Sequence, residues 1–434
     1  MTSVAGAYTA IAEDVEGVAS NAASPAVREP HSFRWFEFDV SAGVSLPGAY
    51  GGTDFNNRGE KGDEGLIDRT SRFLHADLGA RVQAGSFGAV AAAELLQYDV
   101  VQSQGDKPGL KLNYLRSHAT AAYGFWRNQL VMGAGFRIVT LQLSESNTAN
   151  PSNAIPSTGA LLTMTGAGPE LGAVLKPDDV PWRLGATVRA PVSAEPIGRK
   201  DQSSFDGVQR AGSYITPQRI VQPWEIELGA ALQLGPRPLS PRWIDPREEI
   251  ADAKRKVAAA RAARAAARVR SPGERPEDAR AMEAAIRAGE DAQIAEEEER
   301  LYRARKARYE NWPRERLLLL ASLLVSGPSA DAIALEGFLD QKREVVGSSV
   351  SLAPRAGVEA EPMRDRIRAR VGGYIEPSRF ADGTRRQHFT FGGDIKLFQW
   401  SIFGLLPDPT WQITVVVDLA PRYQNYGIGI SNWH

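Results

Sequence analysis

Apolar and polar residues alternate along much of this chain. Every second residue from Leu74 to Ala84 is apolar, and His75, Asp77 and Arg81 lie between them. Similar alternation occurs in the segments 36–46, 182–190 and 411–419. Successive side chains of a β-strand point to opposite faces, so this pattern predicts strands that each have one apolar and one polar face.

The alternating segments are long. Strands of soluble proteins are usually about five to six residues, whereas a tilted strand needs about nine to eleven residues to cross the hydrocarbon core of a membrane. We predict strands at 33–46, 73–85, 89–100, 112–125, 129–143, 161–175, 182–193, 223–235, 315–326, 349–361, 367–378, 387–399, 411–422 and 425–433. This set of about fourteen is even, as in single-chain bacterial barrels.

The links between the predicted strands alternate in length. Those after the second, fourth and sixth strands are short, at 86–88, 126–128 and 177–181, and those between them are longer and polar. Outer-membrane barrels have short periplasmic turns and long outer loops. The sequence therefore predicts an all-β fold, an antiparallel transmembrane β-barrel of about fourteen strands that is integral to a bacterial outer membrane.

Residues 237–314 interrupt this pattern. Glu248–Arg270 and Glu277–Asn311 have helical composition, with a break at 271–276 and a stop at Pro313, so we expect a long helical hairpin. The strand count places it on the periplasmic side. The apolar residues that we expect to dock a partner are Ile250, Val257, Ile286, Ile294, Leu301 and Tyr302. Three alternatives are self-association of the barrel, contact of the basic helix with anionic lipid headgroups, and a solvated hairpin without a partner.

Composition excludes several classes of protein. The formal net charge is -1, so no basic excess points to nucleic acid, and the chain has no cysteine for disulfides or thiolate sites. Mean hydropathy is -0.30, and no apolar run reaches the roughly 18 residues of a membrane-spanning helix. The N-terminus lacks a basic and apolar leader, and we expect the signal peptide to be absent from this sequence.

The polar faces of the predicted strands carry many charges, which we expect to point into the lumen. These residues are Glu37, Asp39, Asp77, Arg81, Arg116, Arg137, Arg183, Arg189, Glu225, Glu227, Arg355, Glu359, Arg368 and Arg370. They could line a polar pore or bind an anionic headgroup. The alternative is a mutually paired network that fills a plugged lumen, because buried charges need partners.

Motifs for catalysis are missing from the sequence. The five histidines have no paired metal-binding spacing, and there is no Gly-x-Ser-x-Gly motif. The Gly-Ala-Gly stretches at 133–135 and 166–168 fall within predicted strands, where they accommodate curvature or a close approach of other chain segments. We therefore expect no enzyme, no metal site and no cofactor.

The N-terminal sequence resembles the hatch of FadL-type outer-membrane proteins. The resemblance rests on Ala5–Asp14, on Asn21–Ala26, and on the Pro-Trp strand starts at 181–186 and 223–229. It implies a fourteen-stranded barrel that carries hydrophobic molecules such as long-chain fatty acids or aromatic compounds, with a hatch inside the lumen. The implied gate residues are Gly6, Ala7, Tyr8, Glu13, Asp14, Asn21 and Pro25. Two departures are Asn21-Ala22-Ala23, where the family has Asn-Pro-Ala, and the helical hairpin.

The expected organisation is a hatch at 1–32, barrel strands at 33–236, the hairpin insertion at 237–314 and further barrel strands at 315–434. Our leading hypothesis is a barrel in outer-membrane lipid that binds or admits a hydrophobic small molecule, gated by the hatch. An apolar pocket for this ligand is expected from the loop residues Leu161, Leu162, Ile333, Leu335, Phe338 and Leu339. The alternative is a plugged, non-conducting barrel that anchors a periplasmic or envelope assembly through its hairpin.

Overall fold

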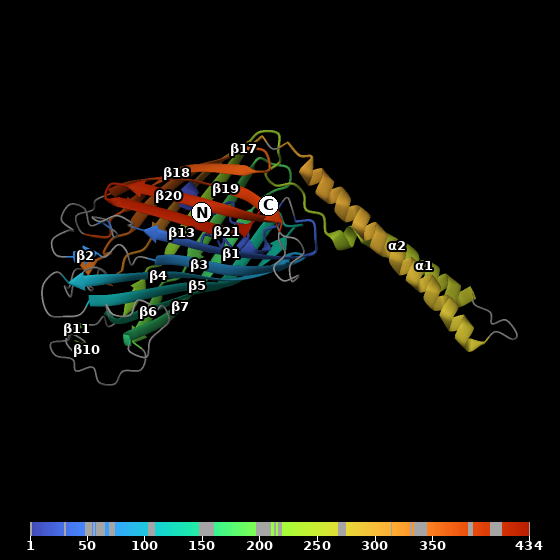
Figure 1. The fold of residues 1–434 in the computed structure, drawn as a ribbon, viewed down its shortest axis with the longest axis horizontal. Coiled ribbons are helices and arrows are strands. Elements are labelled where there is room, and N and C mark those ends of the chain that lie inside the picture. The colour runs from blue at the N-terminus through green and yellow to red at the C-terminus, as the bar shows by residue number, and fades with distance from the viewer. Residues whose placement is uncertain are drawn as a thin grey trace.

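Fourteen long strands of the computed structural model form a closed antiparallel barrel (Figure 1). The structure describes residues 2–29, 32–47, 54, 57, 66–68, 74–102, 109–146, 160–196, 210–211, 214–215, 219–267, 275–313, 315–329, 332–333, 345–380, 385–399 and 410–433. The barrel strands are β1 (Phe36–Pro47), β3 (Leu74–Ala84), β4 (Phe87–Gln102), β5 (Gly109–Phe125), β6 (Leu130–Ser146), β7 (Ala160–Leu175), β8 (Trp182–Arg189), β13 (Glu225–Leu234), β14 (Leu317–Ser326), β17 (Ser351–Met363), β18 (Ile367–Pro377), β19 (Arg385–Gln399), β20 (Thr410–Ala420) and β21 (Tyr423–Asn432).

Each barrel strand pairs with the next in this order, and the first pairs with the last. Ser41 of β1 lies opposite Ser431 of β21, which closes the barrel and leaves no free edge among these strands. Each predicted strand corresponds to one of these observed strands, so the predicted barrel of fourteen antiparallel strands is confirmed.

Shorter strands extend the sheet or lie outside it. β2 (Leu66–Asp68) pairs with β4, and β9 (Val192–Pro196) pairs with β12 (Ile220–Gln222) and with β7. Two further ribbons join β10 (Arg210–Ala211) to β11 (Tyr214–Ile215) and β15 (Ala332–Ile333) to β16 (Val345–Val346).

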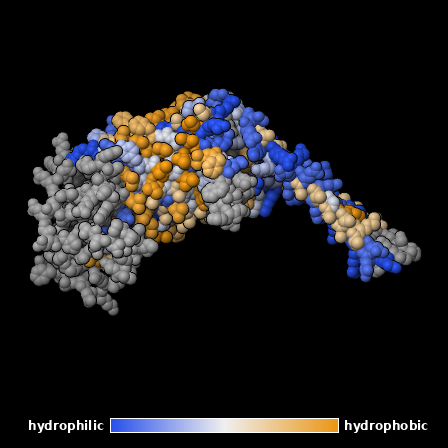
Figure 2. Space-filling view, in the orientation of Figure 1, coloured by the Kyte–Doolittle hydropathy of each residue, from blue (hydrophilic) through white to orange (hydrophobic). Residues whose placement is uncertain are grey.

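The two faces of the barrel wall differ sharply in chemistry. Leu78 is 66% exposed and Phe136 is 57% exposed on the outer face, whereas Arg81 and Arg137 are each only 1% exposed on the inner face. Figure 2 shows the hydrophobic residues as a band across the barrel. A water-soluble protein buries apolar side chains, so this barrel has the reverse arrangement.

Helices α1 (Pro246–Ala267) and α2 (Pro276–Glu310) lie between β13 and β14 and project away from the barrel (Figure 1). They leave the end at which the short turns after β3, β5 and β17 lie, and we name this end the hairpin side and the opposite end the loop side. Arg261 and Arg264 of α1 each bind Glu290 of α2 at 2.6 Å, and Lys254 binds Glu298 at 2.6 Å.

Of the hairpin residues predicted to dock a partner, Ile250 is buried and the others are half-buried. Among the described residues, no helix is both long and apolar enough to span a membrane.

Residues 2–29, named here the N-terminal segment, lie inside the barrel (Figure 1). The segment contains two short 3-10 helices, η1 (Thr2–Val4) and η2 (Ser24–Ala26). The first contacts β17, β18, β19 and β20, and the second contacts β3, β4, β5 and β6. The segment therefore spans the lumen from one part of the wall to another.

Candidate functional site in the barrel lumen

Glycines line the inner wall where the N-terminal segment passes. At these positions a methyl group would lie within 3 Å of an atom of the segment, in most cases a backbone atom. They are Gly88 beside Pro25, Gly133 beside Ala22, Gly172 beside Asn21, Gly185 and Gly229 beside Thr9, Gly357 and Gly372 beside Val4, and Gly392 beside Ser3. The close approach predicted for the stretch 133–135 therefore occurs at Gly133, whereas Gly166 and Gly168 face residues 191–194.

The wall also supplies hydrogen bonds that the irregular backbone of the segment cannot make internally. Thr187 and Arg189 each donate to the carbonyl oxygen of Ser20 at 2.9 Å. Thr390 donates to the carbonyl of Ser3 at 3.2 Å, and Arg355 donates to that of Gly6 at 3.3 Å. Because an unpaired buried carbonyl is costly, these donors favour the docked segment.

Asn21 joins two parts of the segment to the wall. Its Nδ2 atom donates to the carbonyls of Thr9 and Ala173, each at 3.0 Å. Its Oδ1 atom accepts the backbone N–H of Ala23 at 3.0 Å. The side chain is fully buried, so each of these polar contacts replaces a contact with water.

Ion pairs hold the middle of the segment. Asp14 binds Arg81 of β3 at 2.6 Å, and Glu13 binds Arg183 of β8. Of the other expected gate residues, Ala7 is buried and Tyr8 packs against a buried cluster that includes Val4 and Leu320. Burial raises the pKa of Tyr8 well above its ordinary value, so its phenol stays neutral.

The segment leaves the lumen beside the turn after β5. The side chain of Asn128, which has a left-handed backbone (φ 69°), accepts the backbone N–H of Arg28 and donates to the carbonyl of Ala26, each at 2.7 Å. Lys176, directly after β7, donates to the carbonyl of Arg28. Burial and the nearby Arg183 guanidinium lower the pKa of Lys176 to about 7.

The expected inward charges are almost all paired. Within the described residues, ion pairs form at Glu37, Asp39, Arg81, Arg116, Arg137, Arg183, Arg189, Glu225, Glu227, Arg355, Glu359, Arg368 and Arg370. Asp77 is the exception in that part of the chain. Arg370 bridges Glu359 and Asp394, each at 2.7 Å, and Arg137 binds Glu225 at 2.9 Å.

Several partners in this network were not among the predicted site residues. Glu94 binds Arg116, Glu170 binds His118 at 3.0 Å, and Glu376 binds Arg386 at 2.7 Å. The signal for Glu94 is weak because it follows an alanine run in which both faces look apolar. Among the described residues, no group of three or more acidic or histidine side chains is arranged to hold a metal ion.

A cavity of ≈ 550 Å³ lies on the loop side of the N-terminal segment. The segment forms its floor with Gly6, Val15, Glu16 and residues 18–20, and β1, β3, β4 and β21 supply much of the wall. Its arginines, Arg116 and Arg355, are bound by Glu94 and Glu227. Cavities that bind small molecules have volumes of about 300–1,000 Å³, so this one is large enough for such a ligand.

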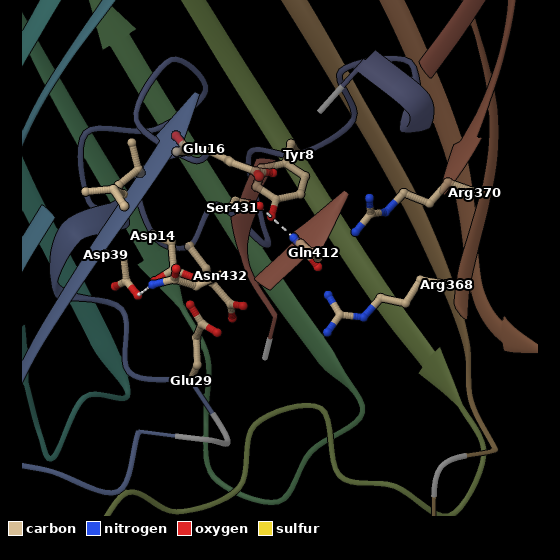
Figure 3. A pocket seen from close by; sticks show the side chains of 14 residues that line it. Tyr8, Asp14, Glu16, Glu29, Asp39, Arg368, Arg370, Gln412, Ser431 and Asn432 are labelled. Carbon is tan, nitrogen blue, oxygen red and sulfur yellow. Dashed lines mark hydrogen bonds between the residues drawn. The ribbon is translucent and has the colours of Figure 1, made fainter. Parts of the chain in front are cut away.

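A second cavity, of ≈ 70 Å³, lies on the hairpin side of the segment (Figure 3). Tyr8, Asp14 and Glu29 line it from the segment, and Arg368 and Arg370 line it from β18. Its hairpin-side position follows from β18, which begins at Ile367 beside the turn at that end. Residues 15 and 16 line both cavities, so the segment separates them.

The expected apolar ligand pocket in the loops stays a prediction, because several of its residues lie outside the described part of the chain. Leu161 and Leu162 lie within β7 rather than in a loop, because β7 begins at Ala160. Neither is among the residues that line the 550 Å³ cavity. Ile333 lies in β15, and Leu335, Phe338 and Leu339 lie outside the described residues.

The described residues thus define a closed β-barrel. Its lumen contains the N-terminal segment of the same chain and a cavity on the loop side of that segment. No family model matches the sequence, and no curated protein matches it. Solved structures similar to this chain include the CymD monoaromatic hydrocarbon channel, with 9% identity, a TM-score of 0.47 and coverage of 98% of this chain and 94% of that one.

Two others are the Pseudomonas putida toluene transporter TodX (12% identity, TM-score 0.44, coverage 94% and 93%) and a Pseudomonas aeruginosa FadL homologue (9%, 0.45, 98% and 97%). FadL-family transporters are thus among the similar structures, as the resemblance of the N-terminal sequence predicts.

Proposed function

We propose that this chain is an outer-membrane β-barrel that binds or admits hydrophobic small molecules, fatty-acid-like or aromatic, with its N-terminal segment as the gate. The hydrophobic band supports the membrane location. Side chains such as Leu78 and Ile428, exposed by 66% and 58%, would lie in water if the barrel were soluble and in hydrocarbon if it spans a membrane.

The observation that carries the gate proposal is the position of the segment between the two cavities. A ligand in the loop-side cavity meets a floor built from the segment, and Val15 and Glu16 form its boundary with the hairpin-side cavity. Specific contacts hold this floor, such as the ion pair of Asp14 with Arg81. Displacing the segment would join the two cavities.

The lining of the loop-side cavity indicates the type of ligand. Val15 and Val18 provide apolar surface from the floor, whereas Arg116 and Asp77 provide charge from the wall. A purely apolar molecule would displace water from these charged groups without offering them a polar contact of its own. An apolar molecule that carries one polar group suits this cavity better.

Filling the cavity tests the proposal. Ala19 lines the loop-side cavity, and Ala80 is an exposed alanine on the outer face of β3. We expect Ala19→Trp to weaken binding of a long-chain fatty acid and of a monoaromatic carboxylate to the reconstituted protein by about tenfold. The added indole would cover apolar surface of the cavity that the ligand contacts in the wild type. The matched variant Ala80→Trp should bind as the wild type. Wild-type binding by Ala19→Trp would refute the proposal.

A second function is favoured by the paired charges of the lumen and by the projecting hairpin. In this alternative the barrel is plugged, non-conducting and structural, and the hairpin recruits an envelope partner. A deletion of residues 255–297 separates the two functions. It removes the outer part of the hairpin, and a short glycine linker rejoins the helices at Lys254 and Glu298, whose side chains already form an ion pair at 2.6 Å. Ligand binding should survive the deletion under the first function, and partner recruitment should be lost under the second.

A further inference from the structure

The chain that leaves the lumen runs directly against the base of the helical hairpin. The ring of Phe33 packs edge-on against Tyr302 and Tyr309 of α2, with centroid distances of 6.3 and 5.6 Å. The guanidinium of Arg34 lies 5.1 Å above the ring of Tyr302. These contacts join the exit of the N-terminal segment to the second helix.

The first helix contacts the same stretch of chain. Arg247, in the first turn of α1, lies 3.4 Å above the ring of Trp35. Trp243, just before α1, lies 4.9 Å below the guanidinium of Arg28. Cation–π contacts of this kind are strongest where water is excluded, and the side chain of Arg28 is buried.

Arg28 connects these contacts to the barrel. Its guanidinium donates to the carbonyl of Gly85 at 2.9 and 2.6 Å, to the carbonyl of Trp35 at 2.8 Å and to Glu37 at 3.0 Å. A shift of Trp243 or Trp35 would therefore disturb the last residues of the N-terminal segment.

The hairpin is packed at this base and exposed to solvent farther out. We define the hairpin root as Trp243, Arg247, Tyr302, Tyr309 and Trp312. Tyr309 is 9% exposed and packs against Trp312 at 5.7 Å, and Arg305 binds Glu249 across the two helices. Farther out, Met282 is 67% exposed, and the pairs between the helices are mainly ionic. Figure 1 shows this outer part projecting free of the barrel.

We propose that the hairpin root is a latch that keeps the N-terminal segment in the lumen, and that displacement of the hairpin loosens the segment. α2 has 35 residues, and at about 1.5 Å per residue it is a lever of roughly 50 Å. A force that displaces its outer end is transmitted to the aromatic contacts at its base. This coupling holds whether or not the barrel transports a ligand.

Hydrogen exchange of the segment amides tests the latch. The N–H groups of Gly17 and Asn21 bond to the carbonyls of Glu13 and Gly17 and report on the docked state. In the reconstituted full-length protein, the double variant Tyr302→Ala with Tyr309→Ala should raise their exchange rate about tenfold, the order expected for losing two aromatic contacts. The control Met282→Ala, at an exposed site of the same helix, should leave it unchanged.

A second pair of variants guards against misfolding. The deletion of residues 255–297 keeps the root and should keep the segment protected, whereas Phe33→Leu keeps an apolar side chain but removes the ring contacts and should loosen the segment. Strands β5 and β6 serve as the internal reference for a folded barrel. Wild-type exchange of the segment in both Phe33→Leu and the double tyrosine variant, with the reference strands protected, overturns the proposal.

Discussion

Arg81 of the barrel wall binds Asp14 of the N-terminal segment at 2.6 Å, and it binds Asp39 of the neighbouring strand at 2.8 Å. One buried guanidinium therefore serves the wall and the segment at once. Removing Asp14 leaves Arg81 with a partner, so the wall should survive a change that weakens the docking of the segment.

We therefore expect Asp14→Asn to weaken docking by about 1–3 kcal/mol, the cost of removing one partner of a buried charged group that keeps its second partner. The measurement is hydrogen exchange at the N–H of Gly17. Glu16→Gln is the matched control, because Glu16 lies in the same segment and forms no ion pair within the described residues. Equal exchange rates in the two variants would show that the pair with Arg81 does not hold the segment.

Part of the lumen network follows from the sequence, because ion pairs between adjacent strands depend only on register. Asp39 lies directly opposite Arg81 in the β1–β3 pair, and Glu359 lies opposite Arg370 in the β17–β18 pair. Once the alternation and the short turns place the strands, such cross-strand pairs follow.

The contacts of the N-terminal segment could not be predicted in this way. Glu13 meets Arg183, and Asn21 meets the carbonyl of Ala173, across large separations in sequence. The segment has only two short helical turns, so no periodic pattern fixes which of its side chains faces which strand. The length of the helical hairpin, by contrast, follows from the composition of the chain. The contact of Phe33 with the base of the hairpin does not.

The glycines of the wall make a separate prediction. A methyl group on Gly172 would lie 2.6 and 2.8 Å from the backbone nitrogens of Ala22 and Ala23. We expect Gly172→Ala to destabilise the docked segment by about 1–3 kcal/mol, the usual cost of overpacking. Trypsin should then cleave after Arg28, which is buried in the wild type. The control is Gly289→Ala on α2, where nothing lies within 4 Å of the added methyl and the cleavage pattern should not change.

Docking of the segment should depend on pH through Lys176. Burial lowers the pKa of this amine from 10.5 to about 7 in the docked state, so the docked state binds fewer protons than a state in which Lys176 meets water. Docking therefore strengthens as pH rises from about 7 towards 10.5, by at most about 1.4 kcal/mol per pH unit. Below about pH 7 the amine is protonated in both states and contributes no slope.

Segment exchange rates measured from pH 6 to 10, corrected for the intrinsic pH dependence of exchange, give this slope. Lys176→Met removes the titrating group and should flatten the profile while keeping an unbranched side chain at the site. The carboxylates of Glu13, Glu29 and Asp178 and the guanidinium of Arg183 also act on this amine. A slope that persists in Lys176→Met would assign the pH dependence to one of these groups or to another titrating group.

The outer face of the barrel gives the test of membrane location. Leu78 on β3 and Met282 on α2 are exposed to nearly the same degree, 66% and 67%. If the barrel spans a bilayer, Leu78→Lys places a charge in hydrocarbon and should lower the free energy of unfolding in lipid vesicles by about 2–4 kcal/mol near the midplane. Met282→Lys adds the same charge to the projecting hairpin and should cost less than about 0.5 kcal/mol, as at an ordinary surface site. In a protein surrounded by water both sites are ordinary surface sites, so equal and small effects of the two lysines would mean that the hydrophobic band faces something other than lipid.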